Sequence, residues 1–260
     1  MDNPAVSLQR IAEHVALVTL TRPEARNAVN GDVARGLEQA VDETEADPDT
    51  WVVILAGSGD GAFCAGADLK AISGGRIHEL HTERGGFAGF VERARGKPWI
   101  AAVHAPALAG GCEIALKCDL IVAAPQARFG VPEVKRGLIA AAGGLYRLPR
   151  ALPPAVAREM ILTGDPIDAS RAHALGMVNV LAPEGTPVLD AALALATRIT
   201  CNAPVAVRES LAVANRAFDL SDAELMAASA QGHRRNMASE DFREGPLAFI
   251  EKRAPRWKGR

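Results

Sequence analysis

Short apolar runs mark strands in the first half of the chain. Residues 6–11 and 15–20, with a polar break at 13–14, predict a β-hairpin that ends before Pro23. Residues 52–55, 100–103 and 120–123 are wholly apolar, as is typical of strands buried on both faces of a sheet. Asn30 is placed to cap a helix whose positions 33, 37, 40, 41 and 44 follow helical spacing, and Asp47-Pro48 ends it. A further helix is expected to begin near Gly110.

Helical periodicity takes over beyond residue 143, where strand patterns nearly vanish. Helices are predicted over 154–163, 170–175, 187–201, 204–218, 221–237 and 239–252. Residues 72–86 hold four glycines and two histidines without a clear period, and predict a flexible loop. The pattern therefore predicts an α/β core followed by a helical extension that packs on the core or extends from it.

Composition narrows the class of protein. A chain of 260 residues, of which 48% are hydrophobic, suits one large domain or one domain with a helical annex. The net charge of −2, without a basic tail or stripe, argues against a nucleic-acid partner. No apolar run approaches the roughly 20 residues of a membrane span, and no secretory or transit pattern precedes the first strand. A cytoplasmic protein without a membrane partner is expected.

The cysteines and histidines do not point to a metal. Cys64, Cys112, Cys118 and Cys201 form no Cys-x-x-Cys pair, and the six histidines lack ligand spacing. We expect free thiols in a reducing compartment and no metal site.

Two loops of small residues are candidates for chemistry. Residues 62–69 (AFCAGADL) and 107–113 (ALAGGCE) each follow a buried strand and lead into a helical turn. Small residues let a ligand approach the backbone, and helix N-termini offer unpaired N–H groups. Two such loops can aim two donors at one developing oxyanion, although tight helix–strand packing explains the same residues.

Two glutamates accompany these loops. Glu113 lies in the first turn after the Gly110-Gly111 pair, and Glu133 follows Pro132. Each is explained as an ordinary acidic residue at a helix start. The apolar neighbours of Glu113 favour a second interpretation, in which burial raises the carboxyl pKa toward neutrality and the two acids divide acid and base roles on one water.

Five segments in register resemble the enoyl-CoA hydratase/isomerase (crotonase) family over essentially the whole chain. They are residues 21–30 (TRPEARNAVN), 62–70 (AFCAGADLK), 98–113 (PWIAAVHAPALAGGCE), 129–133 (FGVPE) and 244–255 (EGPLAFIEKRAP). The resemblance implies an α/β crotonase-like spiral of strand–strand–helix units in two near-perpendicular sheets. It assigns residues 1–195 to the spiral core with an acyl-CoA site and 196–260 to a C-terminal helical trimerisation region. A homotrimer or a dimer of trimers is the implied assembly.

The resemblance also assigns roles to residues of this sequence. The oxyanion-hole amides match Ala67 and Gly110, the catalytic acids match Glu113 and Glu133, and the N–H of Ala141 matches one that helps to hold the water. Positions that bind CoA match Ala25, Arg26, Ala65, Asp68, Leu69, Phe249 and Lys252. The last two reach the nucleotide end, often from a neighbouring subunit, and a lysine there supplies a point charge for phosphate. Lys252 is alternatively a solvated cation at a helix end.

The chain departs from the family pattern in the stretch 137–144. Ala140 and Ala141 stand where the family usually has Pro-Gly, which keeps the Ala141 N–H but adds a methyl group and restricts the backbone. Ala109 replaces the commoner glycine, and His104-Ala105 replaces Asn-Gly.

Retention of both glutamates favours an enoyl-CoA hydratase, which adds water across the 2,3-double bond of a 2-enoyl-CoA. The alternatives are a Δ3,Δ2-enoyl-CoA isomerase, a dehydratase of a specialised thioester such as carnitinyl-CoA or a sterol-derived acyl-CoA, and a non-catalytic acyl-CoA-binding protein. No metal, flavin or nicotinamide is implied, since CoA arrives as part of the substrate. Residues 72–97 and the stretch after Gly137 are expected to shape the acyl pocket.

Overall fold

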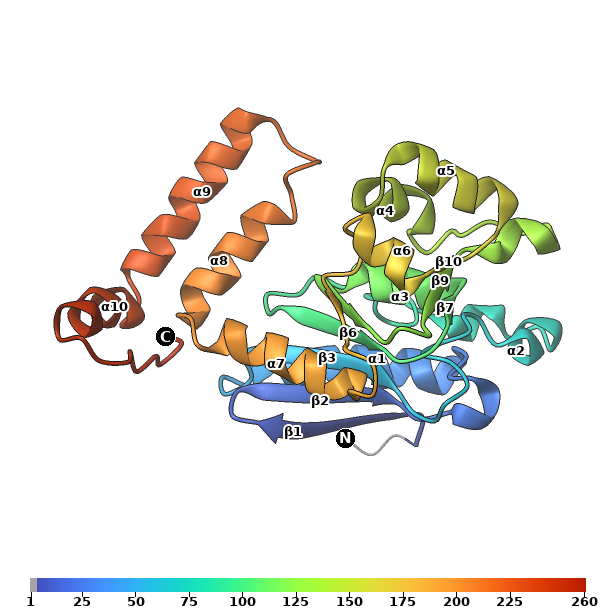
Figure 1. Ribbon diagram of the computed structural model, residues 1–260, viewed down its shortest axis with the longest axis horizontal. Helices are drawn as coiled ribbons and strands as arrows, with labels where there is room; N and C mark the ends of the chain where they lie inside the picture. The colour runs from blue at the N-terminus through green and yellow to red at the C-terminus, as the bar shows by residue number, and fades with distance from the viewer. Residues whose placement is uncertain (1–3) are drawn as a thin grey trace.

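A six-stranded sheet forms the base of the molecule, in a computed structural model that describes residues 4–260 (Figure 1). Its strand order is β1-β2-β3-β6-β8-β11, in which the β1–β2 hairpin is antiparallel and every other pair is parallel. The strands are β1 (Val6–Ala12), β2 (Val15–Leu20), β3 (Val52–Gly57), β6 (Trp99–Val103), β8 (Leu120–Ala123) and β11 (Val180–Leu181). The predicted hairpin and the three predicted central strands are confirmed.

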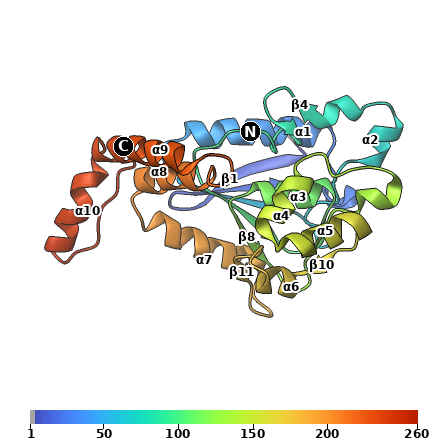
Figure 2. The ribbon, with the colours of Figure 1, turned by 90° about the horizontal axis from the view of Figure 1, so that it is seen from above.

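Helices cover both faces of this sheet, which explains the wholly apolar strands. On one face, Val53, Leu55 and alternate residues of the neighbouring strands pack against α1 (Gly31–Ala46) and α3 (Gly110–Lys117). On the other face, Val52 and Ile54 pack with α7 (Val188–Thr200). Figure 2 shows the sheet between α1 and α7. Asn30 caps α1 by accepting a hydrogen bond from the N–H of Val33, as the sequence predicts.

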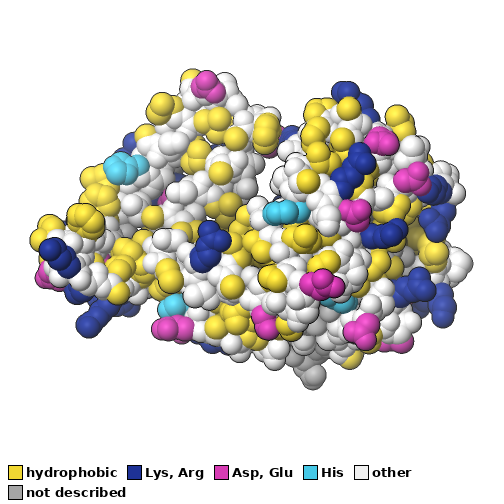
Figure 3. Space-filling view, in the orientation of Figure 1, with side chains coloured by type: hydrophobic (Ala, Val, Ile, Leu, Met, Phe, Trp, Pro, Cys, Tyr) yellow, Lys and Arg dark blue, Asp and Glu magenta, His cyan; other side chains and the backbone are white. Residues whose placement is uncertain are grey.

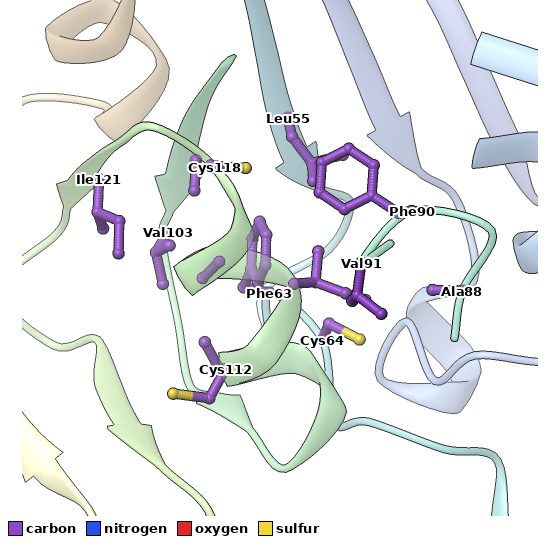
Figure 4. Close-up of a cluster of buried hydrophobic side chains, with 14 of the residues drawn as sticks. Leu55, Phe63, Cys64, Ala88, Phe90, Val91, Val103, Cys112, Cys118 and Ile121 are labelled. Atoms are coloured by element: carbon purple, nitrogen blue, oxygen red, sulfur yellow. The ribbon is translucent and has the colours of Figure 1, made fainter. Parts of the chain in front are cut away.

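A smaller sheet stands over the first and carries the loops of interest. It has the order β10-β9-β7, from strands β7 (Ala107–Leu108), β9 (Arg128–Gly130) and β10 (Ile167–Asp168). Around it lie α2 (Leu69–Ser73), α4 (Gly144–Ala151), α5 (Pro154–Thr163), α6 (Ala169–Ala174), the hairpin β4 (His81–Thr82) and β5 (Gly86–Phe87), and the short 3-10 helices η1 (Pro23–Ala25), η2 (Ile77–Leu80) and η3 (Pro132–Arg136). The buried side chains of Phe63, Phe90 and Val103 join α3 to the large sheet (Figure 4).

The last three helices leave the body of the molecule as an arm, which we define as residues 204–250. They are α8 (Pro204–Ala214), α9 (Asp222–Met237) and α10 (Asp241–Ile250), and they extend to one side in Figures 1 and 2. Apolar side chains gather on the arm in Figure 3, and the side chain of Phe249 is 85% exposed. The boundary predicted at residues 195 and 196 falls within α7, whose Ala192 and Ala196 pack on the large sheet.

The sequence prediction was wrong for the shortest elements. The flexible loop predicted over 72–86 is instead the end of α2, the helix η2 and the β4–β5 hairpin, held by the buried side chains of Leu80 and Phe87. Strands β7, β9, β10 and β11 and helix α4 were not predicted either. Most of these elements have two to five residues, too few to show a period. No helix among residues 4–260 has both the length and the hydropathy needed to cross a membrane.

Candidate active site

Loops from both sheets enclose a cavity of about 570 Å³. Eight of the twelve predicted site residues line it, namely Arg26, Ala65, Ala67, Leu69, Gly110, Glu113, Glu133 and Ala141. Four predicted residues do not line it: Ala25, Asp68, Phe249 and Lys252. The sequence segments around 66, 110 and 133 are therefore neighbours in space.

The two small-residue loops pack backbone against backbone. Gly66 has φ +89°, and a Cβ atom built on it would lie 2.9 Å from the Gly110 nitrogen. The Val29 N–H donates to the Gly66 carbonyl at 2.8 Å, and the Asp68 N–H donates to the Val29 carbonyl at 2.9 Å. This pairing fixes the loop on both sides of Ala67. Within residues 4–260, the N–H groups of Ala67 and Gly110 donate no hydrogen bond, so two donors remain at the wall of the cavity.

Ala109 holds the turn before Gly110 in a conformation that glycine favours. Its φ of +53° and ψ of −132° lie outside the regions allowed for residues with a Cβ atom. The Ala109 N–H donates to the Gly130 carbonyl at 2.9 Å, which joins the turn to β9. Because helix α3 begins immediately after it, this turn sets where the Gly110 N–H points.

Glu113 is a buried acid in the first turn of α3, with only 3% of its surface exposed. Its Oε1 accepts a hydrogen bond of 2.8 Å from the Gly144 N–H at the start of α4. Burial raises the pKa of Glu113 to about 7 against the opposing effect of the Gly144 N–H, and the charge of Glu133 raises it further. Near neutral pH this carboxyl group therefore exchanges a proton readily.

Glu133 is the second acid of the cavity, in the first turn of η3 after Pro132. Burial raises its pKa as well. Its Oε2 is buried, and no group in the described part of the chain forms a hydrogen bond with it. A buried carboxylate oxygen without a partner is costly unless a ligand or water reaches it, so Glu133 has the environment of a reactive group.

The Ala141 N–H is already paired in this structure. It donates to the Ile139 carbonyl at 2.9 Å, which closes a tight turn between α4 and η3. The backbone donor that contacts Glu113 comes from Gly144 instead, three residues later. Sequence reasoning missed this role of Gly144, although the Gly143-Gly144 pair before a helix is the kind of pattern that exposes N–H groups.

Arg26 and Asp68 occupy different places beside the cavity. Arg26 lines the cavity and has φ +52°, and its backbone carbonyl accepts a hydrogen bond of 3.1 Å from the Ala65 N–H. Asp68 instead caps α2 through the Lys70 N–H and pairs with Arg22 at 3.0 Å. Its carboxylate supports the loop from behind. The fully buried Asn27, another residue that was missed, ties the same region to the Ser58 and Ala62 carbonyls.

The rest of the cavity is mainly apolar. The segments expected to shape an acyl pocket supply Ile77, Leu80, Phe87, Leu138 and Ile139. The Phe87 ring packs directly over Gly110, since a Cβ atom there would lie 2.4 Å from it. An apolar chain attached to a polar head therefore fits the cavity, with the head at the Ala67 and Gly110 amides.

Phe249 lies in α10 on the arm and Lys252 follows the arm directly, and neither lines this cavity (Figure 1). The side chain of Phe249 is exposed to solvent, and Lys252 has φ +55° just after α10. Within a single chain, neither side chain belongs to the site.

Comparison with known proteins finds relatives that match nearly the whole chain. Residues 10–260 match the family model described as enoyl-CoA hydratase/isomerase. A carnitinyl-CoA dehydratase of Proteus mirabilis is 38% identical over 248 residues, which cover 94% of each chain. The crystal structure of an enoyl-CoA hydratase from Mycobacterium tuberculosis is 47% identical with a TM-score of 0.93, and covers 99% of this chain and 100% of that one. A carnitinyl-CoA hydratase from Mycobacterium avium is 48% identical with a TM-score of 0.76, and covers 99% of both chains.

Proposed function

Because the chain belongs to the enoyl-CoA hydratase/isomerase family, with the crotonase fold, we propose that it is a hydratase of 2-enoyl-CoA thioesters. One observation carries the proposal. The buried Glu113 and the partly buried Glu133, both with raised pKa values, line the same cavity as two backbone N–H groups that have no acceptor within residues 4–260. The first pair suits proton transfer to and from water, and the second suits an oxyanion.

The thioester carbonyl accepts hydrogen bonds from the N–H groups of Ala67 and Gly110. Addition of a nucleophile at C3 of the enoyl group moves negative charge onto this oxygen. The two amides are held by the packing of Gly66 on Gly110, so they stabilise the enolate without having to reorganise.

Water is held between Glu113 and Glu133. The ionised carboxylate takes a proton from the water while the water oxygen bonds to C3. The protonated carboxyl group then gives its proton to C2, and both additions occur on one face of the double bond. Burial raises the pKa of Glu113 to about 7, so both its protonated and its ionised forms are available near neutral pH, as these steps require, and burial raises the pKa of Glu133 as well.

The decisive experiment follows the loss of the conjugated enoyl-thioester absorbance with short- and medium-chain 2-enoyl-CoAs. Glu113→Gln and Glu133→Gln should each lower kcat by at least about a hundredfold. Glu159→Gln, on the exposed surface of α5, removes the same charge and should leave kcat unchanged. Tight acyl-CoA binding without turnover would replace this proposal with a non-catalytic binding role, and conversion of 3-enoyl-CoA alone would replace it with isomerisation.

Relatives named carnitinyl-CoA dehydratase or hydratase favour a second candidate, in which a specialised 3-hydroxyacyl-CoA loses water by the reverse of the same steps. The two candidates share every catalytic group, and they differ only in the acyl chain. Comparison of kcat/KM for carnitinyl-CoA with that for simple 2-enoyl-CoAs decides between them. A ratio above about a hundred in favour of carnitinyl-CoA would make dehydration the main activity.

We propose further that the enzyme is a homotrimer or a dimer of trimers, in which the arm of one subunit brings Phe249 and Lys252 to the CoA of a neighbour. The support is the exposure of Phe249 (85%) and Ile250 (75%) on an arm that leaves its own cavity. Light scattering should give a multiple of three chains, and Phe249→Asp should weaken the assembly. A monomer that hydrates 2-enoyl-CoA at the full rate would refute it.

The proposed reaction needs no resident cofactor, because CoA is part of the substrate. A cytoplasmic location is consistent with four free thiols, three of them buried. Cell fractionation with an antibody to the chain tests the location.

A further inference from the structure

A second cavity, of about 560 Å³, lies at the opposite end of α3 from the candidate active site. Glu113 and Lys117 are one turn apart on the same face of this helix, about 6 Å along its axis. Glu113 faces the first cavity, whereas Lys117 faces the second together with Arg95, Arg147 and Arg150. The remaining wall includes the loop between α8 and α9, which an ion pair of 2.7 Å from Arg150 to Asp219 holds beside α4 (Figure 1).

Positive charge exceeds negative charge in this cavity. Two carboxylates line it, and both are already engaged. Asp219 pairs with Arg150, and Asp119 accepts from the Trp99 N–H at 2.8 Å and from the Asn215 side chain at 3.0 Å. Three cations, Arg95, Lys117 and Arg147, therefore share one carboxylate, which lies 3.9 Å from Arg95.

Arg95 also has buried hydrogen-bond donors that lack an acceptor. Its side chain is only 5% exposed, and its guanidinium stacks at 4.5 Å over the ring of Phe90. One nitrogen, Nη2, donates to the Lys117 carbonyl at 2.6 Å. Its Nε and Nη1 are buried and have no acceptor in the part of the chain that the structure describes. Buried donors without an acceptor are costly, and beyond the Lys117 carbonyl the polar groups of the described residues that interact with this guanidinium are the weakly accepting Cys118 thiol and the Asp119 carboxylate at 3.9 Å.

The two other cations also have capacity for an anion. Lys117 has no ion-pair partner among residues 4–260, and burial, with the charges of Arg95 and Arg147, lowers its pKa to about 8. Arg147 donates only to backbone carbonyls, those of Ala142 at 2.9 Å and Val91 at 2.8 Å. A guanidinium has five donors in a fixed fork, so donors of Arg147 remain for a ligand.

We propose that this cavity binds a small dianionic oxyanion, of which inorganic phosphate is the simplest example. Three cations share one carboxylate in this cavity, so two positive charges remain to match the two negative charges of a dianion. A planar guanidinium beside an ammonium group is a combination with which proteins bind phosphate. The volume leaves room for a phosphate monoester. The ligand would bridge α3, α4 and the α8–α9 loop, and so tie the base of the arm to the helix that carries Glu113.

Isothermal titration with sodium phosphate tests the proposal, at constant ionic strength maintained with chloride. The native protein should bind phosphate, and also sulfate, with a saturable isotherm. Lys117→Met should weaken binding at least tenfold. The matched control, Arg171→Met, removes one exposed cation of α6 whose nearest carboxylate is 3.7 Å away, and should change the affinity less than twofold.

Two further measurements keep the test decisive. Arg150→Gln, on the rim of the cavity, should also weaken phosphate binding, and it provides the test if Lys117→Met does not fold. A thermal shift that rises linearly with phosphate and is equal in all variants would reflect general exclusion of the salt from the protein surface, and would overturn the site. Because neither measurement depends on hydration activity, failure of the phosphate site and failure of the hydratase proposal are distinguishable.

Discussion

Replacement of Ala109 by glycine should stabilise the protein, whereas the same replacement elsewhere destabilises it. Ala109 has φ +53° and ψ −132° at the turn that begins α3. Non-glycine residues in such sparsely populated regions cost about 1–3 kcal/mol each, because the Cβ atom crowds the backbone. Glycine adopts this conformation without that cost.

Two smaller effects oppose the gain. Glycine adds conformational freedom to the unfolded chain, which costs about 0.4–1 kcal/mol. The Ala109 methyl group also packs near Gly66, where a built Cβ atom would lie 2.8 Å from it, and this partly buried contact contributes less than the ~0.8 kcal/mol of a fully buried methylene. The net expectation is a stabilisation of about 0.5–1.5 kcal/mol, or a rise in Tm of about 1–5 °C for a domain of this size.

Scanning calorimetry of Ala109→Gly beside Ala194→Gly checks the sign. Ala194 is exposed in the middle of α7, so its replacement should lower the stability by about 1 kcal/mol. Glycine at 109 also loosens the turn that aims the Gly110 N–H, and we expect kcat to fall a few-fold. A decrease in Tm equal to that of the control would refute the strain argument.

Three further expectations follow from the site. Glu113→Gln keeps an acceptor for the Gly144 N–H and removes the titrating carboxyl group. Because folding raises the Glu113 pKa from 4.5 to about 7, the native protein loses stability as the pH rises through this range. In urea unfolding, the variant should be up to about 3 kcal/mol more stable than the native protein at pH 8 and equally stable at pH 4. Gly66→Ala places a methyl group 2.9 Å from the Gly110 nitrogen, and steady-state kinetics should show a loss of kcat of at least about a hundredfold. Burial opposes ionisation of Asp68, yet the Arg22 guanidinium and the Lys70 N–H hold its pKa below the usual range. The ionised carboxylate therefore stabilises the protein above about pH 4, and this stabilisation is lost as the pH falls. In the same unfolding assay, Asp68→Asn should cost about 1–3 kcal/mol at pH 7 and little at pH 3.

The large elements could be predicted because each carries its own period or cap. Helix α1 begins after Asn30, which caps it, and the predicted helix 154–163 coincides with α5. The strands β3 and β6 were visible as apolar runs, since α1 and α7 bury alternate residues on opposite faces. These are local signals, and local sequence is enough to read them.

The elements that enclose the cavity carry no such signal. Strands β7 and β9 have two and three residues, and they exist only because each pairs with a neighbour about twenty residues away. The segment 72–86 is ordered by Leu80 and Phe87, which pack into the core from short, irregular structure. Tertiary contacts decide these conformations, so a single sequence does not reveal them.

The same limit applies to the acids themselves. Their positions follow from motifs, but the raised pKa of Glu113 depends on burial by elements remote in sequence and on the Gly144 N–H, 31 residues away. The replacement of Pro-Gly by Ala140-Ala141 acts at this point. Ala140 is buried with 3% exposure, and the Ala141 N–H is paired with Ile139, whereas the Gly144 N–H at the start of α4 donates to Glu113 at 2.8 Å. The Ala141 N–H is present but paired with the Ile139 carbonyl, so under the proposed mechanism the water would be held mainly by the two carboxyl groups, and Glu113 would still be oriented by the Gly144 N–H.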